Sequence, residues 1–266
     1  MDKCRVYKFP QNRWHGGLCN RVFMLCELIS RYKKDNIPFV YNSFKVYNEH
    51  FENFKETITY PVGYVPHDKV KRLPSCEKIR MNFGMDPVEF RTLFKPIASI
   101  QSCVDEFYDK YKRDGENWIG VHMRRTDFQT PKKRKLFFKE DIYLDAAKHI
   151  KKKYLNNNGR FIVFSDDRRI KEIFPKDTVY VVPEAYRKIQ TTLARTDDLV
   201  DLFKMALCDT ILSSNSTFSR FAATYNNIDR YQIKRIVDTK KRIQLFKNRV
   251  YVEDIKVWGL NENSKV

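Results

Sequence analysis

Two adjacent arginines, Arg124 and Arg125, follow a short apolar run and are the first residues whose types suggest chemistry. The run, Trp118 to Met123, is typical of a buried strand in a parallel sheet. A guanidinium group offers a planar fork of donors that matches the oxygens of a phosphate. The alternative interpretation is a surface pair that forms a salt bridge with Asp127. These residues alone leave both interpretations open.

Two further polar clusters also follow predicted strands. Residues 165–167 (Ser-Asp-Asp) follow the apolar run 161–164, and residues 213–217 (Ser-Ser-Asn-Ser-Thr) follow the predicted strand 209–212. Because the carboxyl ends of parallel strands lie at one edge of a sheet, we expect all three clusters to converge. Arginines, hydroxyls and a helix N-terminus would bind phosphate there, and a carboxylate would read a base edge. The pattern predicts a site for a nucleoside diphosphate.

The elements that must position these clusters form an α/β pattern. Apolar residues at helical or strand spacing predict six elements in the second half of the chain. In order they are a helix over 143–154, strands over 161–164 and 178–182, a helix over 196–207, a strand over 209–212 and a helix over 218–225. With the strand at 118–123, this alternation indicates a parallel sheet flanked by helices.

The first half begins with the pattern of a βαβ unit. A weak strand at 4–9 leads to Gly16-Gly17, after which apolar residues at helical spacing extend from Leu18 towards Lys34, and 38–41 reads as a second strand. Residues 42–102 predict short helices and irregular segments, and Val104 to Tyr111 predicts a helix. The turn Asp114-Gly115 is the expected boundary between domains 1–114 and 115–266.

The composition favours anionic partners. Fifty-one Lys and Arg residues against 33 Asp and Glu residues give a formal net charge of +18. Such a charge attracts nucleotides, acidic glycans, nucleic acids and anionic membranes alike. A nucleic-acid-binding protein is therefore the rival class, but the basic residues are scattered along the chain and do not form one motif. No P-loop signature is present in the sequence.

The six cysteines form no CxxC pair and show no metal-ligand spacing. They are expected to be reduced thiols, most of them buried. The N-terminus has no apolar signal core, and no apolar run reaches the length of a membrane span. We therefore expect a cytoplasmic protein without a transmembrane segment.

Five segments in order carry a family resemblance: 16–20 (GGLCN), 122–127 (HMRRTD), 164–167 (FSDD), 201–209 and 215–219 (NSTFS). Together they resemble the superfamily of α1,2-, α1,6- and protein O-fucosyltransferases. The length and the FSDD and NSTFS segments look most like bacterial-type α1,2-fucosyltransferases. The resemblance implies a GT-B-like α/β fold of two Rossmann-like domains with parallel sheets. The N-terminal domain would form the acceptor side and the C-terminal domain the donor side.

The resemblance also implies a reaction. An inverting, metal-independent glycosyltransferase would move a sugar, L-fucose from GDP-fucose, onto a glycan or glycoprotein acceptor without a cofactor. Donors of other glycosyltransferases with the same fold, such as GDP-rhamnose or UDP-xylose, stay open because no quoted residue reads the hexose. A catalytically inactive nucleotide-sugar-binding protein is a further alternative, and nucleic acid is not an expected partner. Such an enzyme would resemble bacterial or large-virus proteins of the cytosol.

Site residues follow from matching motif positions. By resemblance, Arg124 would stabilise the departing diphosphate, and His122 and Asp201 would contact the guanine, whose N1–H and 2-amino group suit a carboxylate. The hydroxyl positions near the phosphates match Ser216 and Thr217. Weaker donor-side candidates are Gly17, Asn20 and Asp167. The alternatives are a core histidine at 122, an exposed acid at 201 and a plain helix cap at 216.

Some positions depart from the family pattern. Cys19-Asn20-Arg21 stands where members usually have Gly-Asn-Gln, Arg220-Phe221 replaces aromatics of α1,2 enzymes, and Lys132 lies where α1,6 enzymes carry a catalytic carboxylate. The general base is consequently open. Asp127, His15 or an acid of the first domain are the candidates, and Asp127 is the one placed with Arg124 in the catalytic set. Arg125 is expected to face away from Arg124 and to be structural.

Overall fold

A computed structural model of the chain describes residues 6–8, 18–35, 39–40, 47, 49–54, 70–72, 85–125, 137–170, 172–182, 196–235, 243–247 and 250–255. The chain divides into two compact units. One comprises Met1–Ser102 with Thr191–Leu199, and the other comprises Cys103–Gln190 with Val200–Val266. The division falls before the Asp114-Gly115 turn and returns one segment to the first unit. The acceptor and donor roles of the two halves stay predictions.

The first unit contains a small parallel sheet with the order β2-β1-β3. Its strands are β1 (Val6–Lys8), β2 (Phe39–Val40) and β3 (Val70–Arg72), and α1 (Leu18–Asp35) connects the first two. Tyr7 pairs in parallel with Phe39. A strand, a helix and a parallel strand form the βαβ unit that the sequence predicts.

Aromatic residues pack the rest of the first unit. The 3-10 helix η2 (Glu52–Phe54) and the helix α2 (Pro87–Leu93) lie among them. The Phe90 ring lies 4.8 Å from that of Phe94 and 6.4 Å from that of Phe23, measured between centroids. These large buried rings supply apolar area that compensates for the short secondary structure.

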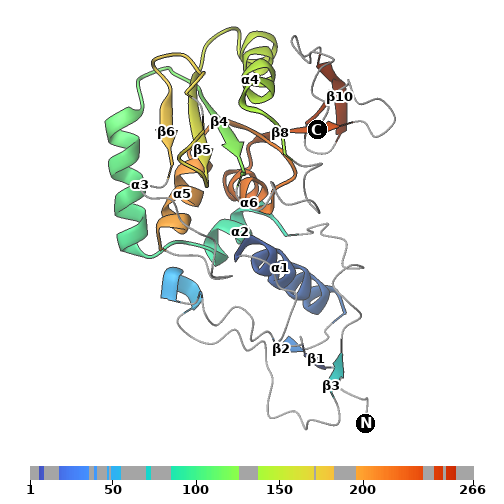
Figure 1. The fold of residues 1–266 in the computed structure, drawn as a ribbon. Coiled ribbons are helices and arrows are strands. Elements are labelled where there is room, and N and C mark those ends of the chain that lie inside the picture. Colours follow the sequence, from blue (N-terminus) through green and yellow to red (C-terminus); the bar gives the residue numbers. More distant parts are fainter. Residues whose placement is uncertain are drawn as a thin grey trace. The chain divides into compact units, whose positions relative to one another are not determined.

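The second unit is built on a sheet with the order β10-β9-β8-β7-β4-β5-β6 in the described residues (Figure 1). The strands are β4 (Trp118–Met123), β5 (Arg160–Ser165), β6 (Val179–Val181), β7 (Thr210–Ser213), β8 (Asp229–Arg235), β9 (Ile243–Lys247) and β10 (Val250–Ile255). Strands β8, β7, β4, β5 and β6 are parallel to one another. Strand β9 pairs antiparallel with both β8 and β10. The parallel part has the strand order of a doubly wound nucleotide-binding fold, with its switch point between β4 and β7.

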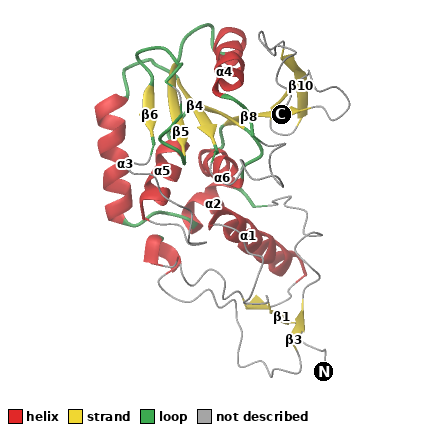
Figure 2. Ribbon diagram, viewed as in Figure 1, coloured by secondary structure: helices red, strands yellow, loops and turns green. Residues whose placement is uncertain are grey.

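Four described helices belong wholly or mostly to this unit, and Figure 2 draws helices in red. They are α3 (Ala98–Tyr111), α4 (Glu140–Tyr154), α5 (Thr196–Ala206) and α6 (Thr217–Asn226). Helix α4 begins with two acidic residues and ends with three lysines, which complements the helix dipole. Left-handed Asn156 and Asn157 follow it and end the helix.

Alternate residues of β4 face opposite layers of the unit. Ile119, Val121 and Met123 are fully buried and belong to the core cluster that includes the apolar face of α4. On the other face, the Trp118 ring packs against Phe107 of α3, with 5.7 Å between centroids. Since side chains alternate along a strand, His122 lies on this second face, away from α4.

Most predicted elements of the second half are present, with shifted ends. Strand β4 has the predicted bounds, α3 begins earlier at Ala98, and β7 is displaced by one residue to Thr210–Ser213. The C-terminal strands β8, β9 and β10 were not among the predicted elements. They extend the sheet beyond β7, so the site described next lies inside the sheet and not at its margin.

Candidate functional site

The three polar clusters converge at the carboxyl edge of the parallel strands, as predicted. His122 of β4 is in register with Ser213 of β7, and Met123 of β4 is in register with Ser165 of β5. Neighbouring strands lie about 4.8 Å apart. The segments that follow β4, β5 and β7 therefore leave the sheet side by side at the switch point, where α/β folds bind ligands.

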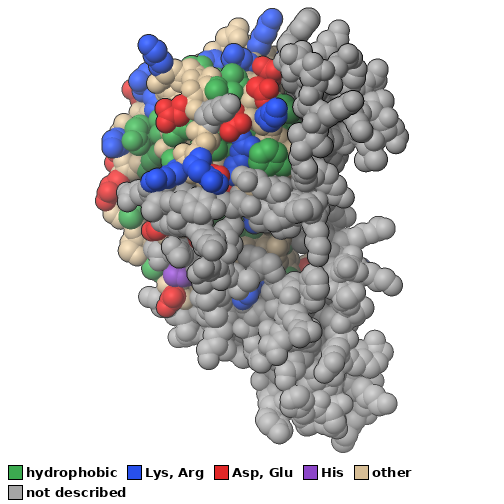
Figure 3. Space-filling view, viewed as in Figure 1, with side chains coloured by type: hydrophobic (Ala, Val, Ile, Leu, Met, Phe, Trp, Pro, Cys, Tyr) green, Lys and Arg blue, Asp and Glu red, His purple; other side chains and the backbone are tan. Residues whose placement is uncertain are grey.

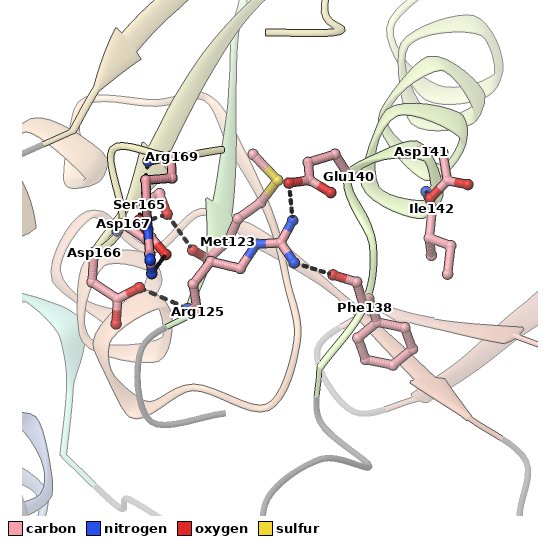
Figure 4. Close-up of polar contacts among 10 residues, drawn as sticks. All are labelled: Met123, Arg125, Phe138, Glu140, Asp141, Ile142, Ser165, Asp166, Asp167 and Arg169. Atoms are coloured by element: carbon pink, nitrogen blue, oxygen red, sulfur yellow. Dashed lines mark hydrogen bonds and ion pairs between the residues drawn. The ribbon is translucent and has the colours of Figure 1, made fainter. Parts of the chain in front are cut away.

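The two arginines after β4 have different environments. The strand ends at Met123, so both follow it, and Arg124 is partly exposed. Arg125 is only 3% exposed; its Nη1 donates to the Phe138 carbonyl oxygen at 2.9 Å and its Nη2 lies 2.5 Å from Glu140 Oε1 (Figure 4). The guanidinium of Arg125 thus lies beside the start of α4. That Arg125 is structural stays a prediction, which its burial and its contacts with Phe138 and Glu140 support.

The turn after β5 is held to β4 by short polar contacts (Figure 4). Ser165 Oγ donates to the Met123 carbonyl at 2.8 Å, and the Arg125 backbone N–H donates to Asp166 Oδ1 at 2.6 Å. These contacts fix the backbone that presents Arg124, because they bind the residues on both sides of it. Asp166 therefore orients the arginine pair, a role that the sequence did not assign to it.

Asp167, a predicted donor-side residue, is buried and bound by Arg169. Both carboxylate oxygens accept from the Arg169 guanidinium, at 2.8 Å from Nε and 2.7 Å from Nη2. This hydrogen bonding outweighs the effect of burial and holds the pKa of Asp167 below its usual range. In this structure Asp167 closes the turn after β5, and its contact with a donor stays a prediction.

The segment after β7 leads directly into α6. Ser216 is 4% exposed and caps the helix, since its Oγ accepts from the Phe218 N–H at 3.3 Å. Thr217 is the first helical residue. The His122 ring packs on Phe218 with 5.4 Å between centroids, so β4 and the first turn of α6 are in direct contact. The structure therefore brings His122, Ser216 and Thr217 together.

Arg230 of β8 supports this segment and was not singled out from the sequence. The described residues give its guanidinium four acceptor oxygens: Ser213 Oγ and Ser219 Oγ, each 3.2 Å from Nε, and the carbonyls of Ser214 and Ser216, at 3.1 Å and 3.4 Å from Nη2. The residue is 8% exposed. A buried arginine that is 11 to 17 residues from its acceptors leaves no local sequence signal.

Tyr143 of α4 is buried beneath the same edge. Burial raises the pKa of its phenol to about 12, and the neighbouring Ser214 partly offsets this rise. The charges of Arg125 and Asp166 also act on the phenol. The phenol therefore lies near Ser214, Arg125 and Asp166, which belong to the segments that follow β7, β4 and β5.

The other predicted site residues are distributed as follows. Asp201 lies in the second turn of α5, partly exposed, with its Oδ1 3.7 Å from Lys204 Nζ. Helix α5 lies between β6 and β7 in the chain. Asn20 lies in the first turn of α1, in the other unit. Gly17, Asp127 and His15 fall outside the described residues.

This edge suits an anion. A helix N-terminus carries partial positive charge and N–H donors, and the partly exposed Arg124 follows the adjacent strand. Two hydroxyl residues, Ser216 and Thr217, stand at the start of the helix. The fold and the site together define a doubly wound α/β protein whose charged edge can stabilise the oxygens of an anion.

Comparison with known proteins makes this class specific. Residues 97–251, more than half of the chain, match the sequence profile of glycosyl transferase family 11. The chain belongs to that family, and it is therefore a glycosyltransferase of the fucosyltransferase superfamily. No curated protein matches the chain in sequence.

Solved structures share the fold. Fucosyltransferase NodZ from Bradyrhizobium is similar with a TM-score of 0.58 and 14% identity, over 92% of this chain and 99% of that one. A NodZ α1,6-fucosyltransferase structure soaked with GDP-fucose gives a TM-score of 0.54, with the same identity and coverage. An Arabidopsis thaliana FUT1 mutant in complex with GDP gives 0.51 and 12% identity, over 87% of this chain and 70% of that one. These similarities confirm the predicted GT-B-like α/β fold.

A membrane-spanning helix is not found in the part of the chain that the structure describes, because no helix there combines sufficient length with sufficient apolarity.

Proposed function

We propose that this glycosyltransferase transfers L-fucose from GDP-fucose to a glycan or glycoprotein acceptor, with inversion and without a required metal or other cofactor. The observation that carries the proposal is the convergence of the segments after β4, β5 and β7 at the switch point of the second unit. It is supported by membership of family 11 and by related folds whose structures were determined with GDP or GDP-fucose.

The proposed roles follow the charge that develops in the reaction. The acceptor oxygen attacks the anomeric carbon of the sugar. The bond between that carbon and the β-phosphate oxygen breaks, and the electron pair of this bond remains on GDP. Arg124 stabilises this departing anion, and the N–H groups at the start of α6 add neutral donors. The acceptor hydroxyl must also lose a proton, and Asp127 is the proposed base.

The nucleotide is read by His122 and Asp201 in this proposal. An Asp carboxylate can accept from both the N1–H and the 2-amino group of guanine, a pair of donors that uracil lacks. His122 packs on Phe218 at the start of α6. The residue that would contact guanine therefore lies against the helix start that would contact phosphate. Gly17, Asn20 and Asp167 remain proposed donor-side contacts.

A panel of ligands tests the donor. Thermal unfolding is measured with GDP, UDP and ADP and their sugars, with and without EDTA, and transfer to glycan acceptors is followed by mass spectrometry. We expect stabilisation by GDP and GDP-fucose that EDTA does not change. A preference for UDP would remove the guanine argument, and a strict metal requirement would remove the role of Arg124 as the substitute for a metal.

A pair of variants tests the catalytic arginine. Arg124→Lys should lower kcat by about a hundredfold or more, because a lysine keeps the charge and loses the planar fork. Arg113→Lys is the matched control, since Arg113 is an exposed arginine in the loop before β4, at the opposite end of the strand. Equal activity of the two variants would contradict the role of Arg124.

A further inference from the structure

Arg230 joins three consecutive parts of the β7–α6 connection. Its Nε contacts Ser213 Oγ at the end of β7 and Ser219 Oγ in the first turn of α6, and its Nη2 contacts the carbonyls of Ser214 and Ser216 between them. Ser219 Oγ also donates to the Ser216 carbonyl at 3.1 Å. One guanidinium on the neighbouring strand therefore fixes the path of the whole turn.

The two carbonyl contacts also determine which way the turn directs its N–H groups. The described residues contain no cis peptide bond, so the C=O of one residue and the N–H of the next point in opposite directions. Arg230 attracts the carbonyls of Ser214 and Ser216. The N–H groups of Asn215 and Thr217 are consequently turned away from Arg230, and Thr217 begins α6, whose N-terminal N–H groups attract anions.

From these contacts we infer that Arg230 is a positioning residue that holds the β7–α6 turn in the geometry required by the donor's diphosphate. This inference rests on the proposed function. Arg230 does not itself touch the donor in this account; it sets the position of Ser216, Thr217 and the start of α6 from the β8 side. Displacement of reacting groups by about 1 Å can cost a hundredfold in rate, which is why such support matters.

Arg230→Lys tests the inference because lysine retains the charge and cannot satisfy the same set of oxygens. The measurement is the Kd of GDP and of guanosine by calorimetry, with kcat and KM for the donor. We expect GDP binding to weaken by about tenfold or more while guanosine binding changes by less than twofold, so that the ratio of the two constants shifts. General damage to the fold would weaken both ligands alike.

Arg160→Lys is the matched control. Arg160 is also buried, at the opposite end of the sheet on β5, where its Nη2 donates to the Tyr111 carbonyl at 2.8 Å. This variant should lose stability without a change in the ratio of GDP to guanosine affinity. An unchanged ratio in Arg230→Lys, or an equal shift in both variants, would overturn the inference.

Two further variants keep the test decisive if Arg230→Lys does not fold. Ser213→Ala and Ser219→Ala each remove one acceptor of the guanidinium, and each should weaken GDP selectively, by about two- to fivefold. No selective loss in either variant would overturn the role of Arg230. Wild-type protein that binds no GDP would instead overturn the proposed function, so the two failures are distinguishable.

Discussion

The pair formed by Arg125 and Glu140 joins the segment after β4 to the start of α4. The two side chains are 4% and 18% exposed and lie 2.5 Å apart. Removing one partner of a buried pair leaves the other charge without compensation, and this costs more than the pair itself contributes. The pair therefore holds Arg125, two residues after β4, beside the first residue of α4.

Glu140→Gln should lower the free energy of unfolding by about 2 kcal/mol, because the Arg125 guanidinium then stays buried without its carboxylate. Urea unfolding measures the loss. Glu89→Gln is the matched control, since Glu89 pairs with Lys33 at 2.6 Å where both side chains are more exposed, and its loss should stay within about 0.5 kcal/mol. Equal losses in the two variants would contradict the structural role of the buried pair.

The buried phenol of Tyr143 should make the free energy of unfolding fall at alkaline pH. Its folded pKa of about 12 lies above the ordinary value near 10, so the native state retains the phenol proton longer than the unfolded state. The stabilisation is fully present below about pH 10 and is lost as the pH rises through 12, by about 2–3 kcal/mol in total. Tyr143→Phe should abolish this part of the decline. Urea unfolding at pH 8 to 12 tests it, and parallel profiles of both proteins would refute it.

The residues of the site differ in how far the sequence reveals them. Arg124 directly follows the apolar run of β4, so its place at a strand end could be predicted from the sequence, whereas His122 and Ser216 were assigned by their match to family motifs. Asp166 and Arg230 could not, because their significance lies in contacts across strands, with the Arg125 backbone and with four oxygens of one turn. Such contacts become visible only when strand order and register are known.

At the scale of elements, the close packing beneath β4 determines where the strand can lie. A Cβ added to Gly120 would meet Cys208 Sγ at 2.9 Å and Ile211 Cγ1 at 3.4 Å. The thiol itself is buried, and burial raises its pKa. The absence of a side chain at position 120 thus allows β4 to approach the segment that leads into β7, and the register of His122 with Ser213 depends on that approach.

Gly120→Ala should destabilise the protein by about 1–3 kcal/mol, because the new methyl overlaps the Cys208 sulfur in a packed core. Adding Cys208→Ala to Gly120→Ala should recover part of this loss, although Cys208→Ala alone is mildly destabilising. Thermal and urea unfolding of the four proteins form a double-mutant cycle. Additive losses would show that the contact between positions 120 and 208 does not limit the packing of β4.

Elements were predicted correctly where the apolar periodicity was long or where turn residues bounded it. Strand β4 and helix α4 are of this kind, and the Asn-rich end of α4 was recognisable as a stop. Strand β8 was not predicted, although Tyr231 and Ile233 alternate with polar residues. It carries Asp229, Arg230 and Lys234, and a short strand rich in charge is stabilised by its pairing with β7 and β9 more than by local propensity.

At the scale of the whole molecule, the division into two units depends on contacts that the sequence does not display. The Asp114-Gly115 turn is a clear local signal, yet the first unit continues only to Ser102 and regains Thr191–Leu199. A segment that belongs to the first unit although it lies much later in the chain is placed there by non-local contacts. Composition along the chain does not reveal such contacts. The resemblance of the ordered motifs, by contrast, identified the superfamily correctly.

The formal net charge of +18 is also a property of the whole molecule, and it is the feature that favours the rival class of nucleic-acid-binding proteins. Figure 3 shows acidic side chains among the basic ones on the described part of one face, as in a mixed surface. Basic residues that are spread in this way attract polyanions weakly and without specificity, and salt screens that attraction. Binding of GDP at the strand edge would instead depend on a few directed contacts from Arg124 and the start of α6.

The two modes of binding differ in salt dependence, and this difference is measurable. Between 50 and 200 mM NaCl, the affinity for a short DNA duplex should fall by about a hundredfold or more, since each phosphate contact releases counterions. GDP affinity should fall by less than about tenfold over the same range, because few phosphate charges are involved. Fluorescence anisotropy with DNA and calorimetry with GDP provide the two slopes. Tight DNA binding at 200 mM NaCl that GDP displaces would assign the strand edge to nucleic acid and contradict its role in binding a sugar nucleotide.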